Sequence, residues 1–345
     1  MPTHRKALSV LCSVALGATL VGCGSSDLQR SAATAATSAT SHPSTSSAAT
    51  AAPVTLTNCG RTITITKPPQ HAVTMNQSAT EVMLTLGLAD RMVGTAFLDD
   101  KILPSLATDY AKVPVLSKEY PSKEKLLDVE PDFVYAAYPS AFDKTAAGSQ
   151  DSLAKAGIAS YVSPLSCENK ALRPKVTTLD DVFAEVREIA KIFGVSDRAE
   201  AYLARQRAMI KTASAQAPAK GLKVLWYDSD DGKLPFVGSC CGGPNMIIKA
   251  LGGTNVFADL QGGWADASWE QFPSRNPDVI VLADASWSTA KEKERKLETD
   301  PGTKNLTAVR ARRFVVLPFS ATSPGVRNPS AIASMAKQLE ALHVS

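Results

Sequence analysis

The chain has 345 residues, of which 44% are hydrophobic and only 6% aromatic. Its formal net charge of +4 is modest and spread along the chain, which argues against a nucleic-acid partner because no helical basic stripe is present. About 290 residues remain once the ends are set aside, more than one compact core usually holds, so we expect two lobes.

Residues 1–23 are predicted to be a targeting segment. A basic start precedes the apolar run from Ala7 to Leu20, which is too short for a membrane-spanning helix. The run ends in Leu-Val-Gly-Cys, which matches the lipobox of bacterial lipoproteins and predicts that Cys23 is lipidated. An ordinary secretory signal cleaved nearby is the alternative. We therefore expect an extracytoplasmic protein that is held to the cell membrane only by its lipid.

Residues 24–52 consist mainly of Ser, Thr and Ala. Such a composition cannot bury enough apolar surface to offset the entropy of ordering. The sequence therefore predicts a flexible tether between the anchor and the folded body.

Four cysteines remain beyond Cys23, in a compartment that permits disulfides: Cys59, Cys167, Cys240 and Cys241. Four cysteines allow three pairings. We favour Cys59 with Cys167, which would tie an N-terminal hairpin to the end of the first lobe. Cys240 and Cys241 then either form a disulfide between neighbours or stay free. Their spacing does not suit a zinc site.

The first part of the folded body begins with a hairpin and continues as alternating strands and helices. Residues 54–66 alternate in polarity around a turn at 58–60. Strands are expected at 71–75, 91–95, 132–137 and 160–164, and helices at 78–88, 122–129 and near 144–156. This βαβ rhythm predicts an α/β lobe with a mostly parallel sheet over residues 53–177.

The stretch 178–216 is predicted to be one long linking helix, with a kink or a restart at Gly194. Residues 217–345 then repeat the βαβ rhythm as a second lobe. Its strands are expected at 223–228, 279–284 and 313–318, and its helices at 244–253, 268–275 and 329–342. The predicted fold is therefore α/β, with two βαβ lobes of mostly parallel sheet connected by a single long helix.

Each lobe carries a copy of one sequence unit, at 122–136 and 268–282, with a constant offset of 146 positions. Ser122 and Ser268 are suited to cap a helix, which would place Glu124 and Glu270 in the first helical turn. An acid there complements the helix dipole by about 0.3–1 kcal/mol. A matched pair of exposed carboxylates could instead meet two basic sockets on a partner.

Three segments carry a resemblance to a known family: NQSATEVMLTLGLADRMVGT (76–95), KLLDVEPDFVYA (125–136) and GGTNVFADLQGGWADASWEQFPSRNPDVIVL (252–282). In this order they resemble the bacterial ABC-transporter substrate-binding proteins for ferric siderophores, haem and cobalamin. The resemblance covers about 54–343. It implies a monomer with a ligand cleft between its lobes. It also implies that Glu124 and Glu270 dock onto arginines of a permease dimer.

The same resemblance implies a set of cleft residues, because ligands of open α/β sheets lie beyond the carboxyl ends of the strands. Aromatic side chains offer flat apolar contact and arginine can hold a carboxylate, although core packing is an equal possibility for each aromatic. The expected ligand-binding residues are Asn76, Gln77, Ser78, Phe97, Lys118, Tyr120, Phe236, Trp264 and Arg327.

The expected cargo is a ferric siderophore or a related iron chelate, because Lys118 and Arg327 favour an anion. Cobalamin, or another bulky cofactor-like molecule, is the alternative. A bare metal ion is not expected, since zinc and manganese need converging ligands and the four histidines are His4, His42, His71 and His343. No resident metal or cofactor is predicted.

An enzyme is the first rival class. The chain lacks a G-x-S-x-G elbow, an H-E-x-x-H motif and a phosphate loop, so no catalytic residue is predicted. The loop 238–243 precedes a helix and could hold an anionic group of a ligand. A surface adhesin or sensor that kept the fold without a transporter is the second rival.

Overall fold

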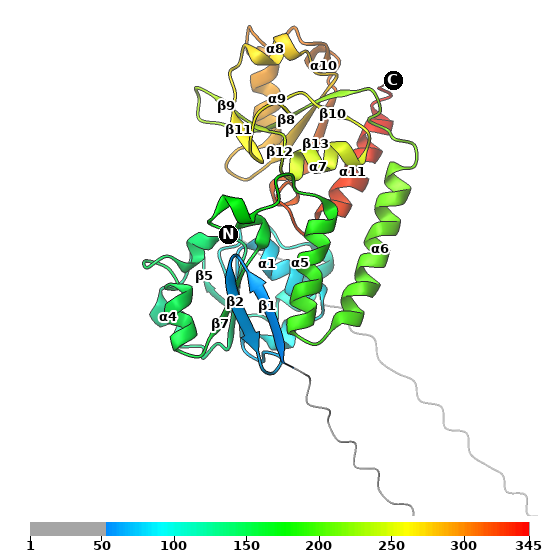
Figure 1. Ribbon diagram of the computed structural model, residues 1–345. Coiled ribbons are helices and arrows are strands. Elements are labelled where there is room, and N and C mark those ends of the chain that lie inside the picture. The colour runs from blue at the N-terminus through cyan, green and yellow to red at the C-terminus, as the bar shows by residue number, and fades with distance from the viewer. Residues whose placement is uncertain (1–52, 345) are drawn as a thin grey trace, which may run out of the picture. The chain divides into compact units, whose positions relative to one another are not determined.

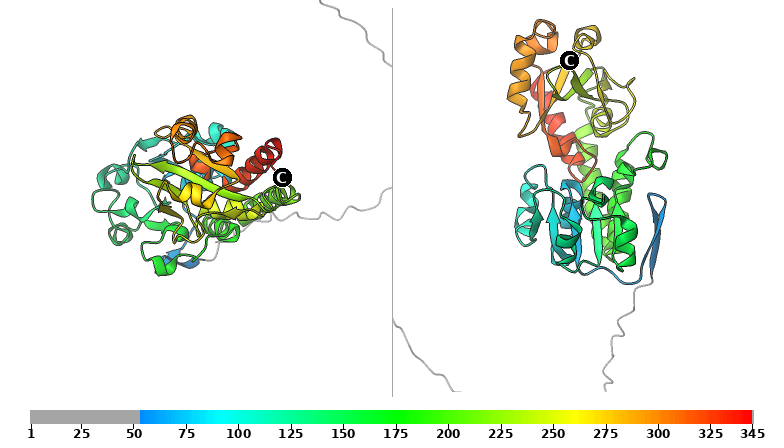
Figure 2. Two further views of the ribbon diagram at one scale, coloured as in Figure 1. Left: turned by 90° about the horizontal axis from the view of Figure 1, so that it is seen from above. Right: turned by 90° about the vertical axis from the view of Figure 1, so that its left-hand side faces the viewer.

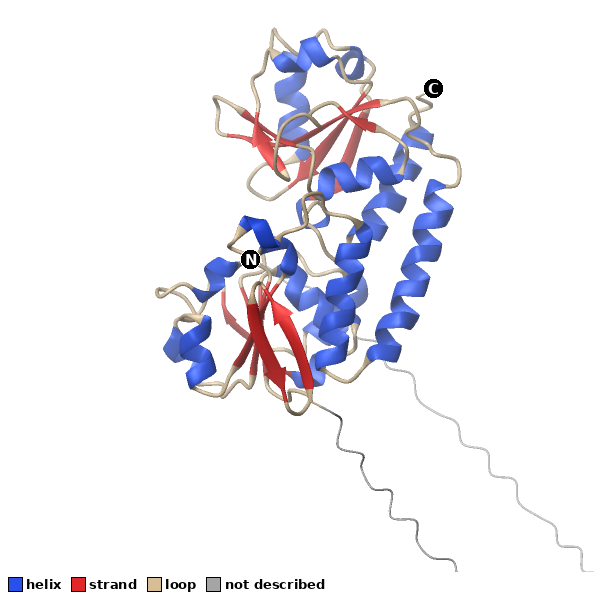
Figure 3. Ribbon diagram, in the orientation of Figure 1, coloured by secondary structure: helices blue, strands red, loops and turns tan. Residues whose placement is uncertain are grey.

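The computed structural model describes residues 53–344, which belong to one compact unit. The predicted signal peptide 1–23, the lipidated Cys23 and the tether 24–52 lie outside the described residues. Two sheets stand one above the other in Figure 1, each flanked by helices, and Figure 3 separates helices from strands by colour. We call the lower sheet with its helices the first lobe and the upper sheet with its helices the second.

The chain enters the first lobe through the predicted hairpin, formed by β1 (Val54–Asn58) and β2 (Arg61–Ile65). Cys59 and Gly60 make the turn with φ of 48° and 81°, the left-handed backbone that a two-residue hairpin turn needs. The Asn58 amide donates to the Val162 carbonyl over 2.7 Å and accepts the Val162 N–H over 2.9 Å. The hairpin is thereby attached to the edge of the first sheet.

The first sheet consists of five parallel strands. They are β3 (Ala72–Met75), β4 (Met92–Ala96), β5 (Val115–Ser117), β6 (Phe133–Ala136) and β7 (Ala159–Val162), in the order β5-β4-β3-β6-β7. Four of them confirm the predicted strands with small shifts at their ends, and β5 was not predicted. Because all five run the same way, their carboxyl ends meet at one edge.

Helices α1 (Gln77–Thr85), α2 (Ala107–Tyr110), α3 (Lys123–Leu127) and α4 (Gln150–Lys155) connect these strands. The helix predicted to begin at Ser78 has a different start. Asn76 occupies the N-cap without a side-chain cap bond, so α1 begins one residue earlier. The Glu81 carboxylate is buried and is paired with Arg327 of the second lobe.

The predicted linking helix is two helices, α5 (Leu179–Ile192) and α6 (Ser196–Ser214). The break falls at Gly194, whose φ of 68° turns the chain back. Figures 1 and 2 place α5 beside α6, and α6 alone continues along the side of the molecule to the second lobe. The connection between the lobes is therefore the single long helix α6.

The second sheet is mixed, with three parallel and two antiparallel strand pairings. Its strands are β8 (Lys223–Asp230), β9 (Pro235–Gly238), β10 (Thr254–Asn255), β11 (Trp264–Asp266), β12 (Val279–Asp284) and β13 (Phe314–Pro318). The order is β11-β9-β8-β12-β13, and β10 also pairs with β8. The predicted strands β8, β12 and β13 run parallel, whereas β9 and β11 pair antiparallel. This antiparallel edge was not predicted.

The helices of the second lobe are α7 (Gly243–Ala250), α8 (Gln271–Arg275), α9 (Ala290–Thr299), α10 (Thr307–Arg310) and α11 (Asn328–Ala341). Helix α11 packs along α6 and so joins the connecting helix to the second lobe. Within residues 53–344, no helix is both long enough and apolar enough to span a membrane.

The repeated unit has a structural role at the Pro-Asp pair of each copy. The Asp132 carboxylate accepts the N–H groups of Gln70 and His71 over 2.7 and 2.9 Å, just before β3. The Asp278 carboxylate accepts the Lys223 N–H over 2.7 Å at the start of β8. Each aspartate therefore fixes the beginning of the strand beside its own.

The helix caps of the two copies differ. The Ser122 hydroxyl accepts the Lys125 N–H, as predicted. In the second copy Ser268 is not the N-cap as predicted, and the Gln271 side chain accepts the Ser268 N–H over 2.9 Å. Glu124 therefore lies in the first turn of α3, whereas Glu270 occupies the N-cap of α8.

Candidate functional site: the interlobe cleft

A cavity of about 610 Å³ lies between the lobes. On the first lobe it is bordered by residues that follow β3, β6 and β7, and on the second by the loops after β9, before β11 and after β13. The carboxyl edge of the parallel sheet is where ligands of open α/β sheets bind. The position of the cavity is therefore the one expected of a ligand cleft.

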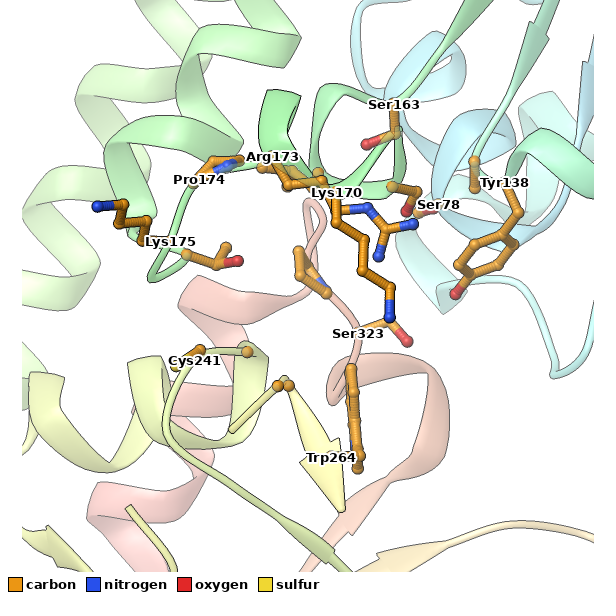
Figure 4. Close-up of a pocket in the computed structure, with 18 of the residues that line it drawn as sticks. Ser78, Tyr138, Ser163, Lys170, Arg173, Pro174, Lys175, Cys241, Trp264 and Ser323 are labelled. Atoms are coloured by element: carbon orange, nitrogen blue, oxygen red, sulfur yellow. The ribbon is translucent and has the colours of Figure 1, made fainter. Parts of the chain in front are cut away.

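The first-lobe wall is a loop, 163–177, that brings three cations to the cavity: Lys170, Arg173 and Lys175. Figure 4 shows Lys170 and Arg173 extending toward the centre, whereas Lys175 lies at the edge with its ammonium group directed away from them. Among the described residues that line the cavity, none is an aspartate or a glutamate. The cleft therefore carries a positive potential that favours anionic groups.

The base of this wall rests on a buried carboxyl. Ser163, which lines the cavity, donates to Glu185 over 2.8 Å, and the Tyr135 hydroxyl donates to the other oxygen of Glu185. Burial raises the pKa of Glu185 to about 7, although the two hydroxyl donors oppose this shift. Its charge beneath the cleft therefore changes close to neutral pH.

The second-lobe wall combines a tryptophan with close backbone packing. Trp264 lies on β11, paired with Gly238 of β9, and its ring borders the cavity. Gly242 packs directly against Gly263, where a Cβ on Gly242 would come within 2.6 Å of the Gly263 Cα. Glycine is therefore required there, since any side chain would push the two loops apart.

A second buried carboxyl, Asp228, lies at the end of β8. Burial raises its pKa, while Ser229, Lys293 and Trp264 act in the opposite direction. Its Oδ1 atom has no hydrogen-bond partner within the described residues. Trp264, which borders the cleft, is thus one of the groups that act on this carboxyl.

Two of the nine predicted ligand residues, Ser78 and Trp264, line the cavity. Three others gather beside it on the first lobe. The rings of Phe97 and Tyr120 meet edge to face at 4.6 Å, and the Tyr120 hydroxyl donates to the Asn76 side chain over 3.2 Å. Asn76 and Phe97 end neighbouring strands with positive φ of 75° and 56°, a backbone conformation that concentrates at functional sites.

The remaining four lie elsewhere. Gln77 donates to Glu81 over 2.8 Å, and Lys118 is exposed. Phe236 is half-buried on β9, where its backbone pairs with Asp266. Arg327 is 7% exposed and holds Glu81, itself 1% exposed, through two hydrogen bonds. The guanidinium thus joins the lobes instead of lining the cavity, and cargo contact by these four residues stays a prediction.

Sequence reasoning missed the cations of the 163–177 loop and Tyr138, which also lines the cavity. The segment ENKALRPK (168–175) has no periodicity from which its facing could be inferred. The feature of the sequence that could have indicated this wall is the cluster of three cations between a predicted strand and a predicted helix. The expectation of an anionic cargo was based on Lys118 and Arg327, which do not line the cavity. The cations that do line it belong to the 163–177 loop.

The residues predicted to dock a permease, Glu124 and Glu270, are exposed. The pKa of Glu270 is lowered by its own backbone N–H and by the Ser268 hydroxyl. Both carboxylates stand at helix N-termini, where the helix dipole favours negative charge. Among residues 53–344, no three His, Cys, Asp or Glu side chains are grouped so as to hold a metal ion.

The model of the periplasmic binding protein family matches residues 73–321, which is most of the described chain. The chain belongs to the periplasmic binding protein family. Members of this family are substrate-binding components of transport systems and not enzymes, so the chain is a binding protein. The predicted family and fold class are both confirmed.

Two kinds of curated relative match this periplasmic binding protein. An uncharacterized ABC transporter substrate-binding lipoprotein, YvrC of Bacillus subtilis, is 24% identical over 299 residues, which is 83% of this chain and 85% of that one. A cobalamin-binding protein of Halobacterium salinarum is 27% identical over 241 residues. That match covers 66% of this chain but only 58% of the halobacterial protein.

Among solved structures, a periplasmic binding protein from Veillonella parvula is 32% identical, with a TM-score of 0.73. The superposition covers 83% of this chain and 97% of that one. Both lobes of this periplasmic binding protein therefore have counterparts in a relative of known structure.

The Cys59–Cys167 disulfide is present, which is the pairing that the sequence favoured. Cys240 and Cys241 form a disulfide between neighbours, one of the two states left open for them. Both bonds lie close to the cleft, since Cys167 belongs to the 163–177 loop and Cys241 lines the cavity.

Proposed function

We propose that this protein captures an anionic iron chelate, such as a ferric siderophore, in the interlobe cleft and delivers it to an ABC importer. The observation that carries the proposal is the cationic wall of Lys170, Arg173 and Lys175. Guanidinium and ammonium groups recognise carboxylate and catecholate oxygens through charge-assisted hydrogen bonds. A chelated ferric ion brings its own ligands, so the protein needs no metal-binding side chains.

Cobalamin is the second candidate, and two observations favour it. The halobacterial relative is named a cobalamin-binding protein. Trp264 also offers a flat surface to a large ring system, with Tyr138 elsewhere on the cavity lining. Against it, a neutral corrin would use little of the positive charge that the first lobe presents.

Quenching of tryptophan fluorescence tests the cargo. The purified protein is titrated with a trianionic ferric tricatecholate, a neutral ferric trihydroxamate, cyanocobalamin and haemin, and Trp264→Phe identifies the signal that comes from the cleft. We expect the tricatecholate to bind most tightly. If cyanocobalamin bound most tightly, cobalamin would replace the iron chelate as the proposed cargo. If none of the four ligands bound, both candidates would be rejected.

We further propose that Glu124 and Glu270 dock the two lobes onto a permease dimer that offers two basic sockets. The proposal is supported by their equivalent places in the repeated unit and by their exposure. Charge pairs of this kind mainly set register and encounter rate.

The docking proposal is tested with the Glu124→Arg/Glu270→Arg double variant. It should bind cargo normally but fail to support uptake by cells. The matched control, Glu119→Arg/Glu340→Arg, reverses two other exposed acids and should leave uptake unchanged. Normal uptake with the Glu124/Glu270 variant would reject the docking role, as expected of an adhesin or sensor without a transporter.

We propose that Cys23 carries the lipid that holds the protein at the outer face of the cell membrane. The support is the Leu-Val-Gly-Cys motif and the lipoprotein name of the Bacillus relative. Cys23→Ser should move the protein from the membrane fraction to the medium or the periplasm. Retention of the variant in the membrane fraction would contradict the proposal.

A further inference from the structure

The disulfide between Cys240 and Cys241 occupies the loop from β9 to α7, on the second-lobe wall of the cleft. Cys241 lines the cavity, and both cysteines are partly exposed. A bond between adjacent cysteines closes a small ring that includes their shared peptide group. Rotation of that peptide is therefore restricted while the ring is closed.

Backbone contacts on both sides hold this ring. The Cys240 N–H donates to the Leu260 carbonyl over 3.2 Å, and the Cys241 N–H donates to the Gly262 carbonyl over 3.0 Å. The Asn245 side chain donates to the Cys240 carbonyl. The carbonyl of Cys241 lies just outside the ring, attached to the Cα atom of Cys241, and takes part in none of these contacts.

The Cys241 carbonyl reaches the first lobe. It accepts the Thr177 N–H over 2.9 Å, and Thr177 is nearly buried. Thr177 ends the 163–177 loop that carries the cleft cations. Near the other end of the loop, Cys167 is bonded to Cys59 of the hairpin, and the Cys167 carbonyl accepts the Arg173 Nε–H.

We propose that the Cys240–Cys241 disulfide is a positioning element for the cationic loop, so that tight binding of anionic cargo requires the oxidised form. The proposal rests on the proposed function, because it assumes that these cations contact the cargo. With the ring closed, the Cα atom of Cys241 is held in place and its carbonyl reaches Thr177, so the loop is fastened at both ends. With the ring open, that Cα atom can shift and draw the carbonyl away from Thr177, which releases the end of the loop that follows Lys170 and Arg173.

The chemical step is a thiol–disulfide exchange with a dithiol reductant. The sulfur–sulfur bond of Cys240–Cys241 accepts two electrons and two protons and becomes two thiols, while the dithiol loses the same and closes to a disulfide. Both cysteines of Cys240–Cys241 are partly exposed, whereas in Cys59–Cys167 only Cys59 is, since Cys167 is 1% exposed. The ring therefore offers a dithiol two accessible cysteines and the other disulfide offers one, so we expect the ring to be reduced first.

Graded reduction tests the proposal on the intact protein. Samples are treated with increasing dithiothreitol, alkylated, freed of reductant, and analysed by mass spectrometry for alkylation at each cysteine. Affinity for the ferric tricatecholate should fall by about tenfold, roughly the effect of one hydrogen bond to a charged group, in step with alkylation at 240 and 241. Unchanged affinity in fully alkylated samples that retain the Cys59–Cys167 bond would overturn the proposal.

The Cys240→Ser/Cys241→Ser variant provides a second route that needs no reductant. It should show the same weakening and no longer respond to dithiothreitol. Affinity for neutral cyanocobalamin should fall less than affinity for the tricatecholate, because displaced cations weaken an anionic ligand in addition to any change in the shape of the wall. Equal weakening for both ligands would show instead that the ring merely supports the cleft.

A combination with Lys170→Gln/Arg173→Gln separates this inference from the proposed function. In that background, loss of the ring should cause no further weakening toward the tricatecholate. If Lys170→Gln/Arg173→Gln alone leaves the affinity unchanged, the proposed function fails. If it weakens binding, but Cys240→Ser/Cys241→Ser causes the same further loss in this background as in the wild-type protein, only the positioning role fails.

Discussion

The two walls of the cleft differ in what they offer a ligand. The first lobe contributes charge, carried by Lys170, Arg173 and Lys175 on a loop that follows its last strand. The second contributes Trp264, a disulfide ring and tightly packed glycine loops fixed by the antiparallel β9–β11 pair. Charge is therefore placed on an irregular loop of the first lobe, and shape on closely packed backbone of the second.

In the repeated unit the two lobes resemble each other more closely, although their helix caps differ. Asp132 and Asp278 fix equivalent strands, and Glu124 and Glu270 start equivalent helices. The repeated segments form part of the scaffold and contain the proposed docking positions. The segments that are not repeated form most of the two walls of the cleft.

Breaking the ion pair between Glu81 and Arg327, which joins the lobes, should have the largest effect on stability. In Arg327→Met the Glu81 carboxylate would stay buried without its partner, so we expect the free energy of unfolding to fall by about 3–5 kcal/mol. Urea unfolding followed by circular dichroism measures it. The double variant Glu81→Leu/Arg327→Met should recover part of the loss, and Arg187→Met, which breaks an exposed pair with Glu200, should change little. A loss as small as that of Arg187→Met would mean that the pair does not join the lobes.

Glu185 should make the first lobe sensitive to pH. Its pKa is about 7 in the folded protein against an ordinary 4.5, so the folded state holds this proton more firmly than the unfolded state. The resulting stability is present below pH 4.5 and is lost as pH rises through 7, by roughly 3 kcal/mol in all. Relative to Glu185→Gln, the wild-type protein should lose stability between pH 4.5 and 8 in urea titrations. Parallel pH profiles of the two proteins would contradict this.

Neutralising the charged wall should change ligand preference rather than stability. Lys170→Gln/Arg173→Gln removes two cations and should weaken binding of a ferric tricatecholate by roughly 10–100-fold, while leaving cyanocobalamin within a factor of about two. Trp264→Ala, on the opposite wall, should weaken both ligands. Isothermal titration calorimetry measures the affinity of each variant for each ligand relative to the wild-type protein. If both variants lost the same affinity for both ligands, the two walls would not have different roles.

The repeated aspartates allow the smallest and finest test. Asp132 accepts two backbone N–H groups through its carboxylate and Asp278 accepts one, so Asp132→Asn forfeits more hydrogen bonding than Asp278→Asn. We expect losses of roughly 1–2 kcal/mol and below about 1 kcal/mol respectively. Thermal unfolding measures which variant loses more stability. A larger loss for Asp278→Asn would mean that the number of backbone N–H groups each carboxylate accepts does not determine its contribution.

Much of the fold could be predicted because its strands are continuous apolar runs. VIVLAD and FVVLP are long enough to identify β12 and β13 without any tertiary information. The strands β9 and β11 could not be predicted in this way. PFVG and WAD are short and end or begin beside glycines, and only their mutual pairing makes them strands.

The site was less predictable because its residues come from irregular segments. Ser78 and Trp264 were predicted from their motifs and line the cavity, but Arg327 was expected there and instead pairs with Glu81. An arginine beside a helix start reads the same in sequence whether it meets a ligand or a carboxylate from the other lobe. Lys170 and Arg173 were missed because nothing local shows which way an irregular loop faces.

The bond between Cys59 and Cys167 spans a sequence separation of 108 residues and encloses nearly the whole first sheet. Tension applied to the chain ahead of Cys59 therefore passes through this bond to the loop before α5. The hydrogen bonds from β1 to β2 and from Asn58 to Val162 would share that load at first. Once they broke, the disulfide would carry the pull past the first sheet to Cys167, near the start of the loop that holds the cleft cations.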